Sequence, residues 1–217
     1  MKQKYTLAEI EVYVRKAAQA IKLDWGLAEE AGKAARWLAA FNLPGPELML
    51  AHLQQLDNLD HRQYFPDTTA EPWQASGGYL CPIITGATLA DRSSQMLAGT
   101  EFKLGSVAYP LLLAATIGQA ARCHKTTFTT SWANVRVSCY ENGIRIDGNH
   151  EDLLLQIAQS ASCRIGSDTK PQQLPSTMAY AVDSDTWCAI DALAFKTYAP
   201  ATAESRAGAG AGLTDND

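Results

Sequence analysis

A helix that is apolar on every side is the feature of this sequence that most limits its fold. From Pro110 to Arg122 the chain carries mainly Leu, Ile and Ala, and Pro110 suits the first position of a helix. A helix with this pattern has no solvent face and is usually buried on most sides. It is also too short to cross a bilayer, which takes about 20 apolar residues. We therefore expect a central helix that other elements of a globular protein enclose.

The first sixty residues predict a unit of three helices. Thr6 and Glu9 have the spacing of a capping box, and apolar residues follow at three- and four-residue intervals. Asp24 is expected to cap a second helix, whose small Ala and Gly side chains allow a neighbouring helix to approach closely. The prolines of residues 44–46 end that helix. A third amphipathic helix then precedes a polar, Pro- and Gly-containing loop over residues 57–79.

The second half mixes strand and helix patterns. Alternation of apolar residues over 128–146, around a Glu141-Asn142-Gly143 turn, predicts a hairpin in which Asn-Gly supplies positive φ angles. We expect further short elements at these places: strands over 79–84 and 102–107, a helix around 89–97, and helices over 150–159, capped by Asn149, and from Asp185 onward.

These patterns predict an α+β fold. An N-terminal three-helix unit (residues 1–60) packs on an α+β body (79–200), which has an antiparallel hairpin sheet and a buried central helix. A Gly-rich acidic tail (201–217) follows. The two parts can also share one core and form a single domain.

Composition excludes several classes of protein. Of 217 residues, 47% are hydrophobic and 19% charged, which is too apolar for a disordered chain. The net charge of −5 argues against a nucleic-acid partner. The sequence has no apolar run long enough for a membrane span, and the polar first nine residues lack the apolar core of a secretion signal. We therefore expect a cytoplasmic protein without a membrane partner.

Familiar catalytic and cofactor motifs are missing from the sequence. The five cysteines show no C-x-x-C spacing, His150-Glu151 does not continue into a zinc-protease motif, and neither a P-loop nor a G-x-S-x-G elbow occurs. We predict no metal and no cofactor. Cys81 and Cys123 are more simply packed thiols than nucleophiles, and His124 has a structural role at a helix C-terminus.

The C-terminal tail and one internal turn are the least ordinary polar segments. In the tail, Gly alternates with Ala before three polar residues, so either it is a flexible terminus or it curls around a ligand. In the second case Arg206 and Thr214 bind substrate, and Asp215 or Asp217 acts as a general base or cation ligand.

The internal turn is the sequence Asp91-Arg92-Ser93-Ser94. It is either an ordinary solvated helix turn or a substrate site. In a site, the planar guanidinium of Arg92 holds an anion and Asp91 orients it.

Three segments carry a family resemblance: Trp25 to Gly32, Leu80-Cys81-Pro82 with Gly86 to Arg92, and the tail from Gly208 to Asp217. They resemble a bacterial, mostly proteobacterial, family known only as a domain of unknown function. The resemblance implies no catalytic residues. It does favour a functional tail if the family pattern extends to the last residues.

Three functions are compatible with these observations. The first is an enzyme or binding protein for a small polar or anionic metabolite, with its site in a cleft between the helical unit and the body. The second is a non-catalytic subunit or assembly factor that docks through its Ala-rich helices, and homo-oligomers fit this role. The third is a transcription regulator, because the helical unit is the more basic part of the chain.

Overall fold

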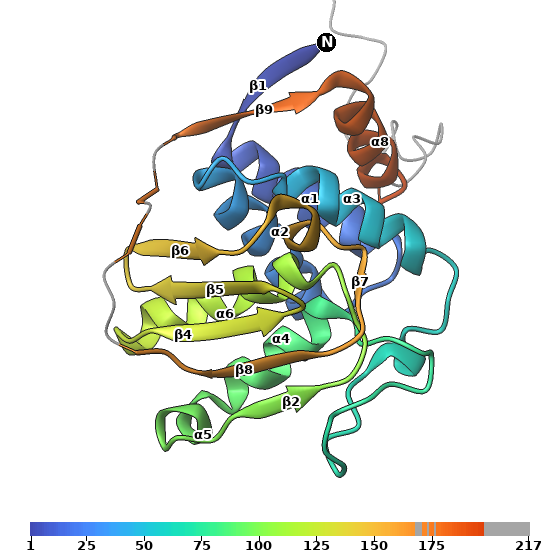
Figure 1. Cartoon of the computed structure of the whole chain (residues 1–217). Helices are drawn as coiled ribbons and strands as arrows, with labels where there is room; N and C mark the ends of the chain where they lie inside the picture. Colours follow the sequence, from blue (N-terminus) through green and yellow to red (C-terminus); the bar gives the residue numbers. More distant parts are fainter. Residues whose placement is uncertain (168–170, 173, 176, 198–217) are drawn as a thin grey trace, which may run out of the picture.

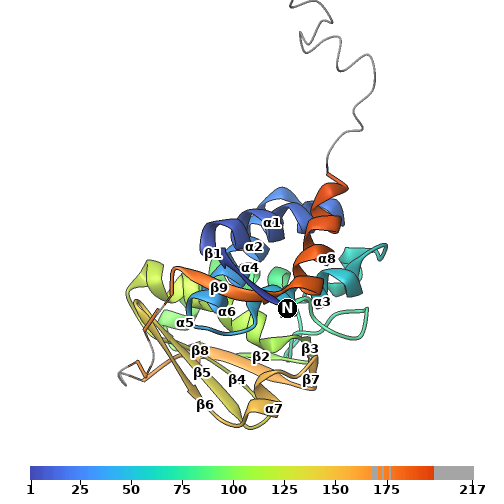
Figure 2. The same cartoon turned by 90° about the horizontal axis from the view of Figure 1, so that it is seen from above.

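The computed structural model describes residues 1–167, 171–172, 174–175 and 177–197, and it has three layers. A five-stranded sheet lies on one side, α4 (Pro82–Asp91) and α6 (Pro110–His124) form the middle, and the N-terminal helices lie on the far side (Figures 1 and 2). This confirms the predicted α+β class. Buried apolar residues of all three layers form one continuous core.

The three predicted N-terminal helices are present as α1 (Leu7–Ala20), α2 (Trp25–Ala40) and α3 (Gly45–Leu56). The Thr6 hydroxyl accepts from the Glu9 amide, and the Glu9 carboxylate accepts from the Thr6 amide, which completes the predicted capping box. Asp24 is the N-cap residue of α2, but its side chain makes no capping bond. Helices α1 and α2 touch at Gly32, where a Cβ atom would lie 2.6 Å from the Glu11 carbonyl oxygen.

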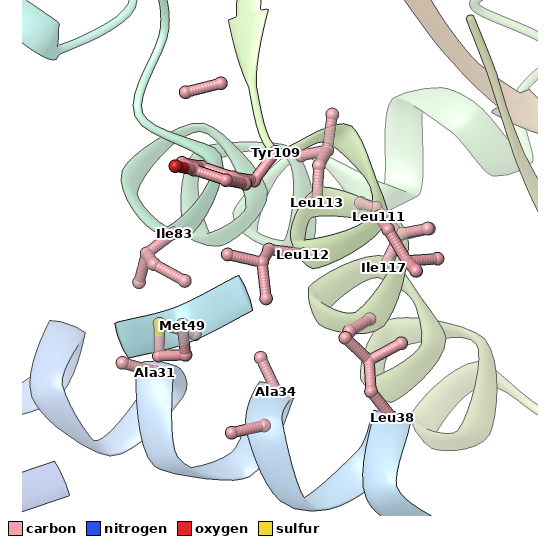
Figure 3. Packing of buried hydrophobic residues seen from close by; sticks show 14 of the residues in the cluster. Ala31, Ala34, Leu38, Met49, Ile83, Tyr109, Leu111, Leu112, Leu113 and Ile117 are labelled. Atoms are coloured by element: carbon pink, nitrogen blue, oxygen red, sulfur yellow. The ribbon is translucent and has the colours of Figure 1, made fainter. Parts of the chain in front are cut away.

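The central helix α6 is buried on nearly all sides, as its sequence predicts. One side packs on α2 and α4, and the other packs on β4 (Phe128–Trp132) and β5 (Val135–Tyr140) of the sheet. Figure 3 shows Leu112 of α6 pointing toward Ala31 and Ala34 on the Ala-rich side of α2. Small side chains on α2 therefore let a bulky helix lie close to it.

The main sheet is antiparallel, with strand order β2-β8-β4-β5-β6. Its remaining strands are β2 (Phe102–Leu104), β8 (Ala161–Ile165) and β6 (Gly143–Asp147). The predicted hairpin is β5–β6, closed by Glu141 and Asn142, with Tyr140 opposite Gly143. Positive φ occurs at Ala133, between β4 and β5, and not at Asn142 or Gly143 as we predicted. A separate short pair joins β3 (Val107–Ala108) to β7 (Ile157–Ala158).

The strand predicted over residues 79–84 is wrong, because Pro82 begins helix α4. Proline at the first helical position needs no amide partner, and burial of the β-branched residues after it outweighs their strand preference. A short helix, α5 (Ser93–Leu97), follows α4 after Arg92. Before α4, residues 57–80 contain only one regular element, the 3-10 turn η1 (His61–Tyr64).

The C-terminal elements of the described chain pack on the N-terminal helices. Strand β1 (Lys2–Thr6) pairs with β9 (Ala179–Asp183), and α8 (Ser184–Phe195) packs on α1 and α3. The Tyr5 and Trp187 rings stack with centroids 3.6 Å apart. Helix α7 (His150–Leu153) has the predicted Asn149 cap but ends early, before β7 and β8. In the part of the chain that the structure describes, no helix has both the length and the apolarity needed to cross a membrane.

Candidate functional site

A groove runs along the junction between the N-terminal helices and the body. It consists of two hollows that meet at Lys33 of α2 and Gln119 of α6, and we call the whole the junction groove. The first hollow, of about 580 Å³, lies between α2, α4 and α6. The second, of about 430 Å³, lies between α1, α2, α6 and the β5–β6 turn. This is where we expected a cleft from the sequence.

Close helix packing sets the floor of the groove. A Cβ atom on Gly118 of α6 would lie 2.6 Å from the Trp37 ring of α2, and one on Gly86 of α4 would lie 2.6 Å from the Thr116 Cβ atom. Larger residues would separate the helices at these points. The glycines thus hold α2, α4 and α6 close together, and the groove forms above their contact lines.

Gln119 lies where the two hollows meet. From Pro110 to Ala121 it is the one residue of α6 that is not buried. Its amide nitrogen is itself inaccessible and has no hydrogen-bond partner in the described part of the chain. A buried donor without a partner is uncommon in folded proteins, because it has lost its hydrogen bonds to water without replacing them. A polar ligand in the groove would supply the missing acceptor.

The first hollow carries excess negative charge. Asp24, Glu30 and Asp91 line it together with Lys33. The Lys33 ammonium lies 2.8 Å from a Glu30 carboxylate oxygen, and this hydrogen bond raises the lysine pKa. Neither Asp24 nor Asp91 forms an ion pair with a described residue. Two carboxylates are therefore available to a cationic group, although solvent weakens each interaction.

The second hollow has a different charge balance. Its Arg36 and Glu11 side chains form an ion pair of 2.6 Å. Arg122, one turn beyond Gln119 on α6, lines the same hollow and forms no ion pair among the described residues. Glu141 stands at the β5–β6 turn on its wall. Arg122 gives this end of the groove a bidentate donor for an anionic group.

His124 closes the first hollow at the end of α6. One ring nitrogen, Nε2, is 2.8 Å from the hydroxyl oxygen of Ser93, which is only 5% exposed, and the ring stands edge-on to Phe128. The other ring nitrogen has no partner among the described residues. A histidine that is held on one side and free on the other can exchange a proton with a ligand. Ser93 does not line the hollow, and its contact with the hollow is through the His124 ring that it holds.

The predicted site residues do not all lie together. Asp91 lines the groove, whereas the guanidinium of Arg92 donates to the Thr68 hydroxyl at 3.0 Å and covers the Trp73 ring. Arg92 is thus held on the loop before α4, and Asp91 makes no ion pair with it. The predicted tail residues Arg206, Thr214, Asp215 and Asp217 lie outside the described residues. Among the described residues, no three His, Cys, Asp or Glu side chains lie close enough together to bind a metal.

Sequence reasoning missed Gln119 and gave His124 only a structural role. A signal for Gln119 was present, because it is the one amide side chain in a run of apolar and small residues from Pro110 to Ala121. For His124 no local signal exists, since its partner Ser93 lies 31 residues away.

Residues 5–81, which run from β1 to the residue before α4, match the model of a family described as "Protein of unknown function (DUF3726)". This confirms the resemblance to a domain of unknown function. No curated protein and no solved structure matches the chain.

Proposed function

We propose that the protein binds a small molecule in the junction groove and that it is either an enzyme or a binding protein for that molecule. The observation that carries this proposal is the buried, unpartnered amide nitrogen of Gln119 at the meeting point of the two hollows. The charges on either side suggest a ligand that is longer than it is wide. A cationic group would contact Asp24 and Asp91, and a polar or anionic group would lie toward Arg122.

If the protein is an enzyme, His124 is its proton donor or acceptor. His124 lines the first hollow, and Ser93 holds its Nε2 atom. Amino acids, short peptides and amine-bearing acids have the required pair of groups. Arg92, which we predicted as the anion clamp, has no role in this site.

A thermal-shift screen with amine-bearing and zwitterionic metabolites tests the proposal. A true ligand should raise the melting temperature of the wild-type chain, and the shift should fall in Gln119→Leu and in Asp91→Asn. Asp191→Asn is a matched charge control, because Asp191 is exposed on α8 and does not line either hollow. If a ligand raises the melting temperature of wild type and of both groove variants equally, its binding site lies outside this groove.

The role as a non-catalytic subunit needs a different surface from the one that we predicted. The Ala-rich face of α2 is buried in the core and cannot receive a partner. Trp25 at the start of α2 is 67% exposed. The preceding residue, Asp24, lines a third hollow, and the exposed side chains of Leu59 and Phe65 line the same hollow. Sedimentation of wild type and Trp25→Ala tests this alternative, which requires wild type to self-associate and the variant to do so less.

No observation favours the third function, a transcription regulator. Part of the basic charge of the helical unit is neutralised within the protein, by the Lys33–Glu30 and Arg36–Glu11 pairs.

A further inference from the structure

A buried thiol–imidazole pair lies at the opposite end of α4 from the groove. Cys81 is the N-cap residue of α4, and its sulfur atom is 3.3 Å from Nε2 of His52 on α3. Both side chains are completely buried. Cys81 and His52 line neither hollow of the junction groove, so this is a separate place in the molecule.

The start of α4 favours negative charge on the Cys81 sulfur. The first amides of a helix have no partner within the helix, and the nearby Ile83 and Ile84 amides lower the pKa of the thiol, although burial raises it more. These donors, together with the positive end of the helix dipole, stabilise a thiolate more than a thiol. His52 is within reach to accept the proton. Thus two groups that activate cysteine nucleophiles meet at one sulfur atom.

Two polar atoms beside this pair lack partners. Nδ1 of His52 and the hydroxyl of Thr85 are both buried without a hydrogen bond to any described residue, and Thr85 lies one helical turn after Cys81 on α4. The ring of Tyr109 stands edge-on to His52, and Tyr109 has a left-handed backbone, with φ of 41°. Unsatisfied buried groups and a strained backbone are more frequent at functional sites than in ordinary cores. The Thr85 hydroxyl can donate to an oxygen of a small molecule next to the thiol.

The segment of chain from Tyr64 to Tyr79 lies next to Cys81. The carbonyl oxygen of Tyr64, in η1, accepts from the Cys81 amide at 3.0 Å, and the Tyr64 ring packs against the Tyr79 ring. Burial, followed by interactions with Tyr64, the Cys81 thiol and Tyr109, raises the pKa of the Tyr79 phenol. Figure 3 shows Tyr109 beside Ile83 of the first turn of α4. Three phenol rings thus lie close to the thiol–imidazole pair.

The covered pair is neutral and unreactive. Burial raises the pKa of Cys81 to about 11 and lowers that of His52 to about 3, with a further lowering by His61. Neither proton transfer nor attack occurs while water is excluded. Apart from its inward side chains, the segment from His61 to Tyr79 is mostly exposed and makes few buried contacts, so its local opening costs less than global unfolding.

We propose that Cys81 and His52 form a nucleophilic site for a small uncharged ester or thioester, reached when the Tyr64–Tyr79 segment opens. His52 takes the proton of the thiol, and the sulfur forms a bond to the carbonyl carbon while Thr85 donates to the carbonyl oxygen. The bond from that carbon to the leaving oxygen or sulfur breaks, and His52 returns the proton to the departing alcohol or thiol. Water then hydrolyses the acyl-cysteine and releases the acid. The surrounding apolar side chains, Met49 and Ile83 among them, favour an uncharged substrate.

Site-resolved alkylation with iodoacetamide provides the first test, because the chain contains its own controls. Cys139 and Cys163 are as buried as Cys81 but have no histidine beside them, and both have raised pKa values for the same reason, burial. In native full-length protein, mass spectrometry should show Cys81 alkylated on the order of tenfold faster than these two at neutral pH. Equal rates for all three would mean access by global unfolding only and would overturn the proposal.

The role of His52 has its own readout. In His52→Gln, Cys81 should lose reactivity mainly below pH 8, because its thiol must then ionise without a neighbouring base, while Cys139 and Cys163 keep their rates. Thr85→Val should not slow alkylation but should slow acetyl transfer from 4-nitrophenyl acetate to Cys81. Cys81→Ser, with its fold checked by circular dichroism, is the control for this reaction. If the variant takes up acetyl groups at other residues as fast as wild type takes them up in total, the acyl-transfer step is excluded.

Discussion

Single glycines decide how closely the helices of this protein approach one another. Gly118 of α6 lies against the Trp37 ring, so even one added methyl group meets the indole. Gly26, near the exposed start of α2, has no heavy atom within 4 Å of its Cβ direction and serves as a matched position. The two glycines have the same chemistry but different surroundings.

Gly118→Ala should therefore lower the free energy of unfolding by about 1–3 kcal/mol, because the core has no room for the extra carbon. Gly26→Ala should raise it by about 0.5–1 kcal/mol through helix propensity alone. Urea unfolding monitored by circular dichroism measures both changes. A neutral Gly118→Ala would show that Trp37 moves aside without cost.

His52 makes stability depend on pH. The pKa of His52 is about 3 in the folded chain and 6.5 in a model peptide. Between these two pH values, His52 is therefore protonated in the unfolded chain and neutral in the folded chain. The contribution of neutral His52 to the free energy of unfolding is complete above pH 6.5 and is lost as the pH falls toward 3. The loss approaches about 1.4 kcal/mol per pH unit within that window.

Urea unfolding of wild type and His52→Gln at pH 7.5, 6.5 and 5.5 tests this dependence. Wild type should lose more stability than the variant over the range, while both respond alike to their common carboxylates. Parallel losses in the two proteins would show that folding does not lower the pKa of His52.

Among single residues, sequence patterns indicated the capping box and Asp91 but not the pairs that define the sites. The Thr6–Glu9 box is local, because both partners lie within one helical turn. The contacts of His124 with Ser93 and of Cys81 with His52 join residues about thirty positions apart. Spacing along the chain carries no information about such pairs until the helices are placed.

At the scale of elements, the helix α1 depends on its first turn. Thr6 ends β1 and caps α1, so its side chain serves at the boundary of two elements. Thr6→Ala should lower the free energy of unfolding by about 1 kcal/mol, and Thr6→Ser should retain most of it because the hydroxyl remains. Thermal unfolding followed at 222 nm checks this prediction, which fails if both variants lose the same amount.

Elements with strong local patterns were predicted well, and those made by distant pairing were not. The apolar run of α6 and the alternation of β4, β5 and β6 appear directly in the sequence. By contrast, β1 is a polar segment that becomes a strand by pairing with β9 near the other end of the described chain. Strand β8 was also missed, although it lies between β2 and β4 in the middle of the sheet order.

For the whole molecule, the contacts of β9 and α8 predict cooperative unfolding. These elements pack on the N-terminal helices rather than on the sheet, and one core connects all layers. Urea transitions measured by tryptophan fluorescence and by circular dichroism should therefore coincide. A fragment of residues 1–60 should fail to fold, because it lacks the cover of α8, β9 and α6. Two separate transitions, or a folded fragment, would instead favour independent units.

The predicted arrangement of a three-helix unit on an α+β body was correct because each part shows its own periodicity. The packing of β9 and α8 on the N-terminal helices has no local signal in the sequence. It involves residues far apart in the chain, such as the stacked rings of Tyr5 and Trp187. The junction groove was expected on general grounds, and its residues became known only when α2, α4 and α6 were placed together.

The loop that covers Cys81 has a second attachment, to the edge of the main sheet. The Trp73 amide donates to the Lys103 carbonyl of β2, and the Gly105 amide donates to the Trp73 carbonyl. These bonds occupy backbone groups that would otherwise face solvent beside the outer strand. If the loop detached completely, two molecules could pair through their exposed sheet edges and begin to aggregate. The loop can uncover the thiol without exposing the sheet edge only if Trp73 stays bonded to β2. The movement must then be confined to the parts of the loop around Tyr64 and Tyr79.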